Sequence, residues 1–263
     1  MAARSNRDGM TAQRWIAERY AAQARFVADL AQPLIGLLKP LPGQLILDLG
    51  CGDGALTESV IAAGARVVGT DLSFDQVAAT RARGVPAVVA DGCALCFAPV
   101  FDAVLTNAAL HWILRPDAAV DGMWRALKPG GRVVGEMGGA GNVAVIAGVL
   151  MAALERRGIE SQSVYPWYFP TPGAYRARLE ARGFAVDYIE LIPRPTDLPG
   201  DIAGWFETFG ESFLFAVPVA ERADFIAETV AALRPILFEP HGRWIADYVR
   251  LRFTAHKPET DRD

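Results

Sequence analysis

The sequence is poor in cysteine and histidine and has no surplus of basic residues. Its 263 residues include only three cysteines and three histidines. A sparse, odd number of cysteines argues against a disulfide framework and is typical of a reducing cytoplasm. Cys93 and Cys96 form one isolated pair, whereas a metal or redox site of this type needs further ligands. We therefore expect no bound metal.

Charge and hydropathy argue against further classes of partner. The formal net charge is -4, whereas chains that bind nucleic acid usually carry a basic surplus. The longest apolar run, Val143–Leu154, is shorter than the ~18 residues that a membrane-spanning helix needs. The first ten residues carry arginines but lack the apolar centre of a secretory signal. We expect a cytoplasmic monomer or weak dimer that binds neither nucleic acid nor membrane.

Apolar runs and helical segments alternate along most of the chain. Such alternation predicts an α/β fold with a mostly parallel, seven-stranded sheet covered by helices on both faces. We expect a single domain over residues 1–263, with a helical cover at 1–42 and a helical lid at 196–240, inserted between the last two strands. The expected strands are Leu45–Leu49, Arg66–Thr70, Pro86–Ala90, Phe101–Thr106, Arg132–Met137, Phe184–Ile192 and Ile245–His256.

A glycine loop follows the first expected strand and opens a helix. Gly50, Gly52 and Gly54 carry no side chains, so a ligand can approach the backbone closely. In open parallel sheets, ligands bind at the carboxyl ends of strands, where the strand order reverses. With Ala55, the same loop also satisfies the dinucleotide pattern G-x-G-x-x-A. The loop alone therefore leaves an NAD(P)-dependent oxidoreductase open.

Acidic residues favour a cationic adenosyl ligand over a dinucleotide. Asp48, two residues before the first glycine, would repel a pyrophosphate but attract the ammonium and sulfonium groups of S-adenosylmethionine (SAM). Asp71 follows the second strand, where either ligand would offer ribose hydroxyls. Asp91 follows the third strand, where a carboxylate can accept a hydrogen bond from the adenine amino group.

Several motifs, taken in order, carry a family resemblance. The segments LDLGCGDG (47–54), TDLS (70–73), ADG (90–92), FDAVLTNAALHW (101–112) and LKPGGR (127–132) resemble the ordered motif set of class I SAM-dependent methyltransferases. Trp15, Tyr20 and Phe26, with WYFPTPGAY at 167–175, extend the likeness to the trans-aconitate methyltransferase-like group. This resemblance implies a Rossmann-like fold and SAM as cofactor.

The resemblance also implies which residues contact SAM. Asp48 would hold the methionine end, Asp71 the ribose, and Asp91 the adenine edge. Tyr20 would close the site from the N-terminal helix. The full set implied is Tyr20, Asp48, Gly50, Gly52, Gly54, Asp71, Leu72, Asp91, Gly92, Asn107 and Ala108.

The acceptor site is less defined. His111 is the one histidine near the implied methyl group, and it is our candidate general base for a hydroxyl or ammonium acceptor; a carboxylate acceptor needs no base. Aromatic clusters either pack in a core or line an acceptor pocket, and our pocket candidates are Trp112, Trp167, Tyr168, Trp205 and Phe209. Three arginines either pair with a substrate carboxylate or form surface ion pairs: Arg176, Arg194 and Arg243.

The sequence thus predicts a SAM-dependent methyltransferase whose acceptor is a small organic molecule, such as a carboxylate or a hydroxyl compound. Two alternatives stay open at this point. One is an NAD(P)-dependent oxidoreductase that uses the same glycine loop, and the other is a SAM-binding protein without catalytic activity.

Overall fold

A computed structural model of the chain describes residues 31–259. Seven strands form one sheet in the order β3-β2-β1-β4-β5-β7-β6, and only β7 runs antiparallel to its neighbours. The predicted α/β fold with a mostly parallel, seven-stranded sheet is therefore confirmed. The strands are β1 (Leu45–Leu49), β2 (Arg66–Asp71), β3 (Ala87–Val89), β4 (Phe101–Asn107), β5 (Leu127–Gly138), β6 (Ala185–Asp197) and β7 (Ile245–His256).

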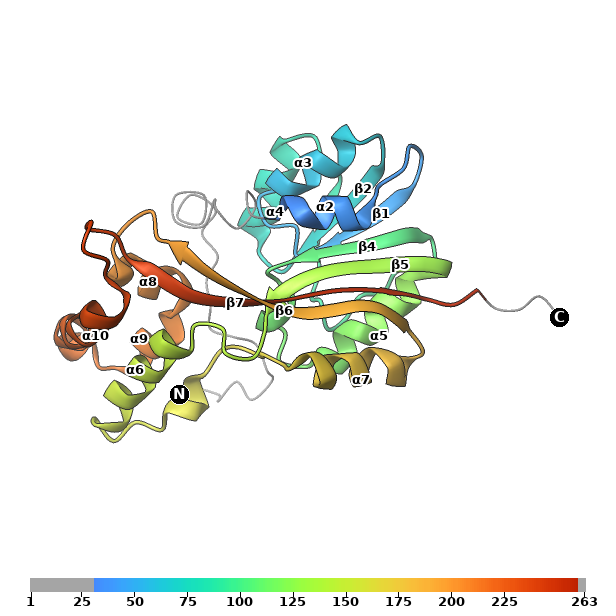
Figure 1. Cartoon of the computed structure of the whole chain (residues 1–263). Coiled ribbons are helices and arrows are strands. Elements are labelled where there is room, and N and C mark those ends of the chain that lie inside the picture. The colour runs from blue at the N-terminus through green and yellow to red at the C-terminus, as the bar shows by residue number, and fades with distance from the viewer. Residues whose placement is uncertain (1–30, 260–263) are drawn as a thin grey trace, which may run out of the picture.

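Helices cover both faces of this sheet. Figure 1 shows α2, α3 and α4 on one side of the strands and α5 and α7 on the other. Side-chain caps begin two of these helices, since Ser73 Oγ accepts a hydrogen bond from Gln76 N at 3.3 Å and Thr171 Oγ1 accepts one from Ala174 N at 3.2 Å. The bounds are α2 (Gln32–Leu38), α3 (Ala55–Ala62), α4 (Phe74–Ala82), α5 (Pro116–Ala126) and α7 (Pro172–Arg182).

Alternation along the strands builds one apolar layer on each face. Leu47 of β1 and Val104 of β4 belong to the cluster that includes Met123 of α5. Their neighbour Ile46 belongs to the opposite cluster, together with Leu34 of α2. Burial on both faces explains why the central strands read as apolar runs in the sequence.

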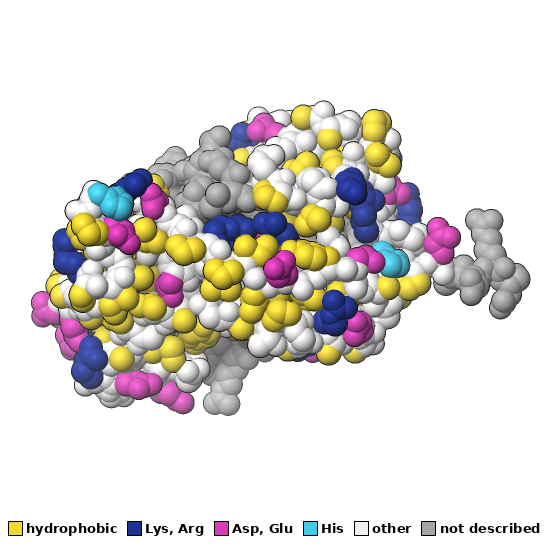
Figure 2. All heavy atoms as spheres, in the orientation of Figure 1, with side chains coloured by type: hydrophobic (Ala, Val, Ile, Leu, Met, Phe, Trp, Pro, Cys, Tyr) yellow, Lys and Arg dark blue, Asp and Glu magenta, His cyan; other side chains and the backbone are white. Residues whose placement is uncertain are grey.

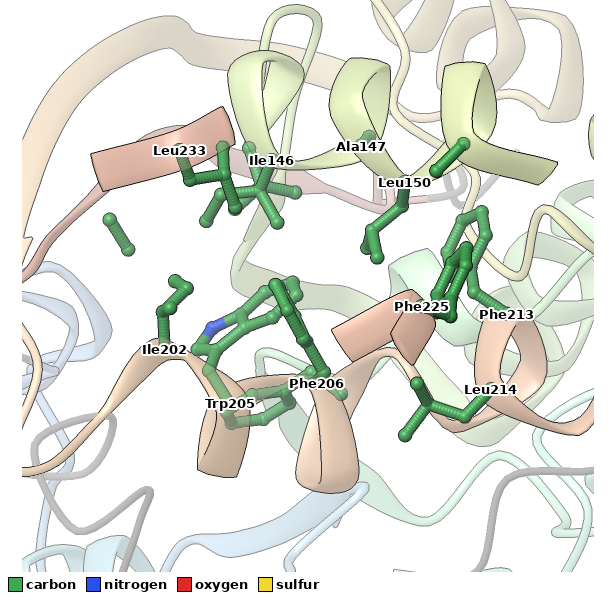
Figure 3. Close-up of a cluster of buried hydrophobic side chains, with 14 of the residues drawn as sticks. Ile146, Ala147, Leu150, Ile202, Trp205, Phe206, Phe213, Leu214, Phe225 and Leu233 are labelled. Carbon is green, nitrogen blue, oxygen red and sulfur yellow. The ribbon is translucent and has the colours of Figure 1, made fainter. Parts of the chain in front are cut away.

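The remaining helices form a second body, which we call the lid lobe: α6 (Ala144–Glu155), α8 (Ile202–Phe209), α9 (Glu211–Ala216) and α10 (Arg222–Leu237). Figure 1 shows these four helices gathered beyond one end of the sheet. Helices α8, α9 and α10 lie between β6 and β7 in the chain, and α6 follows β5. In Figure 3, Ile146 and Leu150 of α6 face Trp205 and Phe206 of α8 across a buried apolar cluster. The lid lobe therefore has a core of its own.

Part of the expected N-terminal cover is not described. Residues 1–30, with Tyr20 among them, lie outside the described residues, and α2 is the described part of segment 1–42. Between residues 31 and 259, the helices are too short or too polar to cross a bilayer. That same range holds no group of three or more His, Cys, Asp and Glu side chains suited to a metal ion. Figure 2 shows acidic and basic side chains interspersed over one face, with a band of basic ones across its middle.

Candidate active site

Strand order reverses between β1 and β4, which are direct neighbours in the sheet. Ligands of open α/β sheets bind outside the carboxyl ends of the strands at such a reversal. The described cofactor candidates follow or end β1, β2, β3 and β4. Because these strands are parallel, the candidates lie along one edge of the sheet.

The turn after β1 depends on its glycines. Gly50, Gly52 and Gly54 have φ angles of 76°, 55° and 82°, in the left-handed region that other residues adopt only with strain. A Cβ atom at Gly50 would lie 2.2 Å from the Cβ of Ala109, whereas one at Gly52 would meet no atom of residues 31–259 within 4 Å. The turn is thus packed at Gly50 against Ala109, just after β4, and the described residues leave space for a ligand beside Gly52.

Asp48 lies in β1 with its side chain buried at 3% relative exposure. Thr57 Oγ1 of α3 donates a hydrogen bond to Asp48 Oδ2 at 2.6 Å. Burial raises the pKa of Asp48 to about 6, against the lowering effect of the Thr57 bond and with a further increase from nearby Asp71. At neutral pH this carboxylate is a buried negative charge behind the glycine turn.

Asp71 ends β2 and braces the glycine turn. Its carboxylate accepts hydrogen bonds from Gly52 N at 3.1 Å and from Ser73 N at 2.9 Å. Burial raises the pKa of Asp71, and both backbone bonds oppose that shift. A carboxylate has about four lone-pair sites, so Asp71 keeps capacity to accept ribose hydroxyls. Leu72 beside it is half exposed, as an apolar surface for adenine would be.

Asp91 and Gly92 follow β3 and are held by local contacts. Asp91 Oδ1 accepts a hydrogen bond from Cys93 N at 2.8 Å, and Asp91 Oδ2 lies 3.8 Å from Arg115 Nη2. A Cβ atom at Gly92 would lie 2.5 Å from Cδ1 of Ile113. The side chain of Ile113, which the sequence did not single out, therefore packs directly against Gly92.

The end of β4 brings the cofactor and acceptor candidates together. Asn107 is the last residue of β4, and Ala108 follows it with a φ angle of 55° and donates its N–H to Glu136 O at 2.8 Å. His111 lies in the short 3₁₀ helix η1 (Leu110–Trp112), where its Nδ1 accepts a hydrogen bond from Gly138 N at 3.2 Å. A neutral imidazole with an accepting Nδ1 carries its proton on Nε2.

His111 is neutral at physiological pH. Burial lowers its pKa well below the ordinary value, and the positive charge of Arg250 adds to the effect. For His111 to act as a base through Nε2, Nδ1 would have to release the Gly138 N–H. In the observed arrangement the ring is therefore a hydrogen-bond donor at Nε2.

A narrow cavity, with about 30 Å³ accessible to the centres of water molecules, lies between the end of β4 and the lid lobe. Six of our candidates line it, and the structure brings them together from three separate segments: Ala108, His111 and Trp112 after β4, Trp167, and Trp205 and Phe209 in α8. The lining residues are Ala108, His111, Trp112, Asn142, Val143, Trp167, Phe169, Trp205, Phe209, Tyr248 and Arg250.

The aromatic lining is tightly packed. The rings of Trp167 and Phe169 are stacked with centroids 5.6 Å apart, and Trp205 lies 6.1 Å from Trp167. Trp205 Nε1 donates a hydrogen bond to Tyr248 Oη at 2.7 Å. Trp167, Trp205 and Phe209 also belong to the core of the lid lobe. The same side chains therefore pack the lobe and line the cavity.

Tyr168 is the pocket candidate that does not line this cavity. Its Oη accepts a hydrogen bond from Arg178 Nε at 3.3 Å, and its ring packs against the sheet core. Neighbouring residues of an extended segment point to opposite sides, so Trp167 and Phe169 face the cavity while Tyr168 faces away from it.

The arginines weighed from the sequence all have acidic partners. Arg194 forms a bidentate pair with buried Glu136 at 2.6 and 2.8 Å. Arg243 lies 2.6 Å from Asp197, and Arg176 lies 3.3 Å from Glu180. The arginine that lines the cavity is instead Arg250 of β7, with 6% relative exposure.

Sequence reasoning missed Asn142, Tyr248 and Arg250. A signal for Arg250 exists in β7, because alternation places it on the same face as buried Tyr248. A charged side chain that continues a buried strand face is unusual and indicates a paired or functional group. Asn142 offers no comparable local signal, since it precedes α6 in an irregular turn.

Comparisons with known proteins agree with this geometry. Residues 47–135 match the sequence model of the family described as "Methyltransferase domain". An uncharacterized methyltransferase of Schizosaccharomyces pombe is 38% identical over 256 residues, which cover 92% of this chain and 98% of that protein.

Solved structures share the fold at low sequence identity. The YcgJ protein of Bacillus subtilis has a TM-score of 0.61 at 16% identity, with 90% of this chain and 100% of that chain covered. A Haemonchus contortus phosphoethanolamine N-methyltransferase 2, solved with S-adenosylhomocysteine (SAH), has a TM-score of 0.58 at 20% identity, covering 92% of this chain and 57% of that one. With the long relative, the family model and the strand order in agreement, the chain belongs to the class I methyltransferases, the family whose methyl donor is SAM.

Proposed function

We propose that this chain transfers the methyl group of SAM to a small organic acceptor bound in the aromatic cavity. The observation that carries the proposal is the position of Ala108. This residue directly follows the cofactor candidate Asn107 at the end of β4, and it also lines the cavity. A donor in the crevice and an acceptor in the cavity would therefore meet at one point.

The residues at the sheet edge fit SAM. Among residues 31–259, no side chain or backbone fills the space beside Gly52, where the ligand would lie, and buried Asp48 supplies negative charge for its ammonium and sulfonium groups. Asp71 would accept the ribose hydroxyls, and Asp91 would accept from the adenine amino group. When bound, SAM supplies a methyl group whose bond to the positively charged sulfur breaks as a lone pair of the acceptor attacks.

The protein's own contribution is to hold the acceptor in line and to exclude water. The buried rings of Trp167, Trp205 and Phe209 enclose the cavity from the lid lobe, and we propose that segment 196–240 acts as a lid in this sense. Because His111 is neutral and its Nδ1 is an acceptor, the geometry favours an acceptor that is already ionised, such as a carboxylate. A hydroxyl acceptor with His111 as base stays a prediction.

The two alternative functions, an NAD(P)-dependent oxidoreductase and a non-catalytic SAM-binding protein, differ from this proposal in the ligand bound or in turnover. A dinucleotide would place its pyrophosphate at the glycine turn, close to the charge of Asp48. A non-catalytic SAM-binding protein would bind SAM but turn over no acceptor. The trans-aconitate methyltransferase-like subgroup, a cytoplasmic location, a monomer or weak dimer, and the absence of nucleic-acid and membrane partners stay predictions.

Calorimetry tests the proposal with SAM, SAH and NAD(P). We expect SAM and SAH to bind and NAD(P) not to bind. The Asp71→Asn variant should bind SAH roughly tenfold more weakly, because hydrogen bonds to a charged acceptor contribute about 1.5–3 kcal/mol. A screen of small carboxylates and hydroxyl compounds should then yield turnover, measured as SAH release.

The matched control is Asp75→Asn, the same chemical change on the exposed face of α4. Its SAH affinity should stay within about twofold of the unsubstituted protein. Binding of NAD(P) without SAM would favour the oxidoreductase. Tight SAM binding with no turnover across a broad acceptor screen would favour the non-catalytic protein.

A further inference from the structure

Two buried N–H groups of the cavity lining, His111 Nε2 and Asn142 Nδ2, have no hydrogen-bond acceptor in the described part of the chain. Both side chains line the cavity, and they are 6% and 4% exposed. A buried donor that is left unpaired is unfavourable, so such groups normally bind protein, water or ligand atoms. The two donors therefore indicate a place in the cavity for an accepting atom.

Backbone contacts fix the orientation of both donors. Gly138 N of β5 donates to His111 Nδ1 at 3.2 Å, so the proton of the neutral ring is on Nε2. Val249 N of β7 donates to Asn142 Oδ1 at 2.9 Å, so the donating end of the amide is Nδ2. Because a backbone N–H already occupies each accepting atom, neither side chain can turn its acceptor into the cavity without losing a hydrogen bond.

Gly138 brings the two polar side chains close together. Its N–H binds His111, and a Cβ atom at its position would lie 2.8 Å from Asn142 Nδ2 and would also clash with the ring of Phe169. The Phe169 ring in turn packs against His111, with ring centroids 5.7 Å apart. The lack of a side chain at Gly138 thus allows His111, Asn142 and Phe169 to lie around one residue of β5.

The narrow cavity limits what these donors can bind. About 30 Å³ is accessible to the centres of water molecules, and one water needs roughly 10–15 Å³ of such space. The cavity therefore matches a group of about two oxygen-sized atoms. In this conformation it has space for the oxygen-bearing end of a ligand, and not for a whole ring.

An oxygen that carries no hydrogen suits both donors. A carboxylate or carbonyl oxygen has two lone pairs and can accept from Nε2–H and Nδ2–H together. A hydroxyl group would add a donor of its own, whereas three accepting side-chain atoms of the lining already accept hydrogen bonds: His111 Nδ1, Asn142 Oδ1 and Tyr248 Oη. Burial of a hydroxyl hydrogen without a partner is unfavourable.

We propose that His111 Nε2–H and Asn142 Nδ2–H together bind one hydrogen-free oxygen of the acceptor, in a carboxylate or a carbonyl group. This inference rests on the proposed function, because it assigns the oxygen chemistry of the molecule that occupies the same cavity. Ala108 also lines this cavity and directly follows the cofactor candidate Asn107, so the bound oxygen would lie near the methyl group of SAM. His111 and Asn142 are specificity-determining residues, which select such ligands over the corresponding alcohols.

The experiment follows the ring nitrogens of His111 by NMR in the SAH-loaded protein. The chain has three histidines, so histidine-labelled protein gives few signals, and the signals lost in His111→Gln are those of this ring. The probes are acetate, acetone and isopropanol, which have nearly the same shape but differ at the oxygen. We expect the free ring to be neutral with its proton on Nε2, and acetate or acetone to shift the Nε2–H signal. Isopropanol should bind roughly tenfold more weakly.

The variant Asn142→Asp replaces the donor by an acceptor of the same size and keeps Oδ1 for Val249 N. It should abolish the preference for acetate or acetone over isopropanol, while SAH still binds. Asn142→Ala removes the donor without adding a charge, and it serves if Asn142→Asp does not fold. The matched control is Gln162→Glu, the same amide-to-acid change on an exposed residue, which should keep the full preference.

The possible failures are distinguishable. No SAH binding by the unsubstituted protein would overturn the proposed function itself. If SAH binds, three results would overturn the donor pair alone: no shift of the His111 signal by acetate or acetone, isopropanol bound as tightly as either, or a preference that survives in Asn142→Asp. A ring proton on Nδ1 would overturn it as well. A shift by acetate alone would assign a carboxylate ligand, and a shift by acetone alone would assign a carbonyl compound.

Discussion

Asp48 and His111 are buried ionisable side chains on the two sides of the proposed methyl-transfer site, and burial favours the neutral form of each. For Asp48 the pKa rises to about 6, and for His111 it falls well below its ordinary value. Asp48 is still ionised at neutral pH, whereas His111 is not. The charges around the site are therefore set by environment rather than by residue type alone.

The raised pKa of Asp48 predicts a pH-dependent cost to stability. The folded protein binds a proton at Asp48 more tightly than the unfolded chain does, so stability falls as pH rises through about 6. Asp48→Asn removes this charge and should stabilise the cofactor-free protein at pH 7.5, by on the order of 1–3 kcal/mol. The same variant should bind SAM more weakly. Urea denaturation and calorimetry measure the two effects.

The gain from Asp48→Asn should vanish below about pH 4, where both forms of the side chain are uncharged. Thr57 Oγ1 can donate its hydrogen bond to an aspartate or to an asparagine at position 48, so the substitution keeps this contact. A variant that is less stable than the unsubstituted protein at pH 7.5 would contradict the assignment of Asp48 as a destabilising buried charge.

At His111 we expect the acceptor function of Nδ1 to matter for stability. His111→Ala leaves the buried Gly138 N–H without this partner and should cost about 1–3 kcal/mol. His111→Asn keeps an acceptor on a shorter side chain and should cost less. Denaturant unfolding of both variants gives the comparison. Equal losses in the two variants would argue against the hydrogen bond, and full turnover by His111→Ala with its true acceptor would exclude the base role.

At the scale of single elements, the turn between β1 and α3 is determined by two separate demands on glycine. One is the left-handed backbone at Gly50, Gly52 and Gly54. The other is the close approach of the chain at the end of β4, which only Gly50 meets at 2.2 Å from Ala109. The sequence pattern predicted the turn, because glycine spacing is local information. It did not predict that Gly50 packs against Ala109, because the two residues are distant in the chain.

A pair of variants separates these two demands. Gly50→Ala and Gly84→Ala both place a side chain at a similar φ, 76° and 79°, but a Cβ atom at Gly84 meets no described atom within 4 Å. We expect Gly84→Ala to cost about 1–2 kcal/mol from backbone strain alone. Gly50→Ala should cost about 1–3 kcal/mol more from overpacking, and it should weaken SAH binding. Thermal unfolding with and without SAH tests both. Equal losses of stability in the two variants would show that Ala109 moves aside at little cost in free energy.

At the scale of the whole molecule, the sheet and the lid lobe have separate cores, and both β7 and the segment at Trp167 and Tyr168 contribute side chains to each. The N-terminal half of β7 buries Ala246 and Tyr248 in the lid lobe, while its C-terminal half buries Leu251 and Phe253 under the sheet. The buried face of the strand changes between Arg250 and Leu251. The proposed acceptor cavity lies at this junction, so relative motion of the two bodies would open or close it.

Two core substitutions of equal chemistry test how independent the two bodies are. Phe206→Ala in the lid lobe and Phe101→Ala under the sheet each remove a fully or almost fully buried ring and should each cost about 3–5 kcal/mol. Hydrogen exchange should increase mainly in α6, α8 and α10 for Phe206→Ala, and mainly in β1, β4 and α5 for Phe101→Ala. An equal increase in hydrogen exchange throughout the chain in both variants would mean that the sheet and the lid lobe unfold as one unit.

The sequence by itself determined the order of strands and helices, the glycine turn and the acidic residues after successive strands. These features follow from local periodicity, capping and backbone sterics, which act over a few residues. Only the tertiary structure decided that α6 joins the lid lobe, that Tyr168 turns away from the cavity, and that Arg250 meets His111 there. Contacts between distant segments are set by packing of whole faces against one another, and no local pattern contains that information.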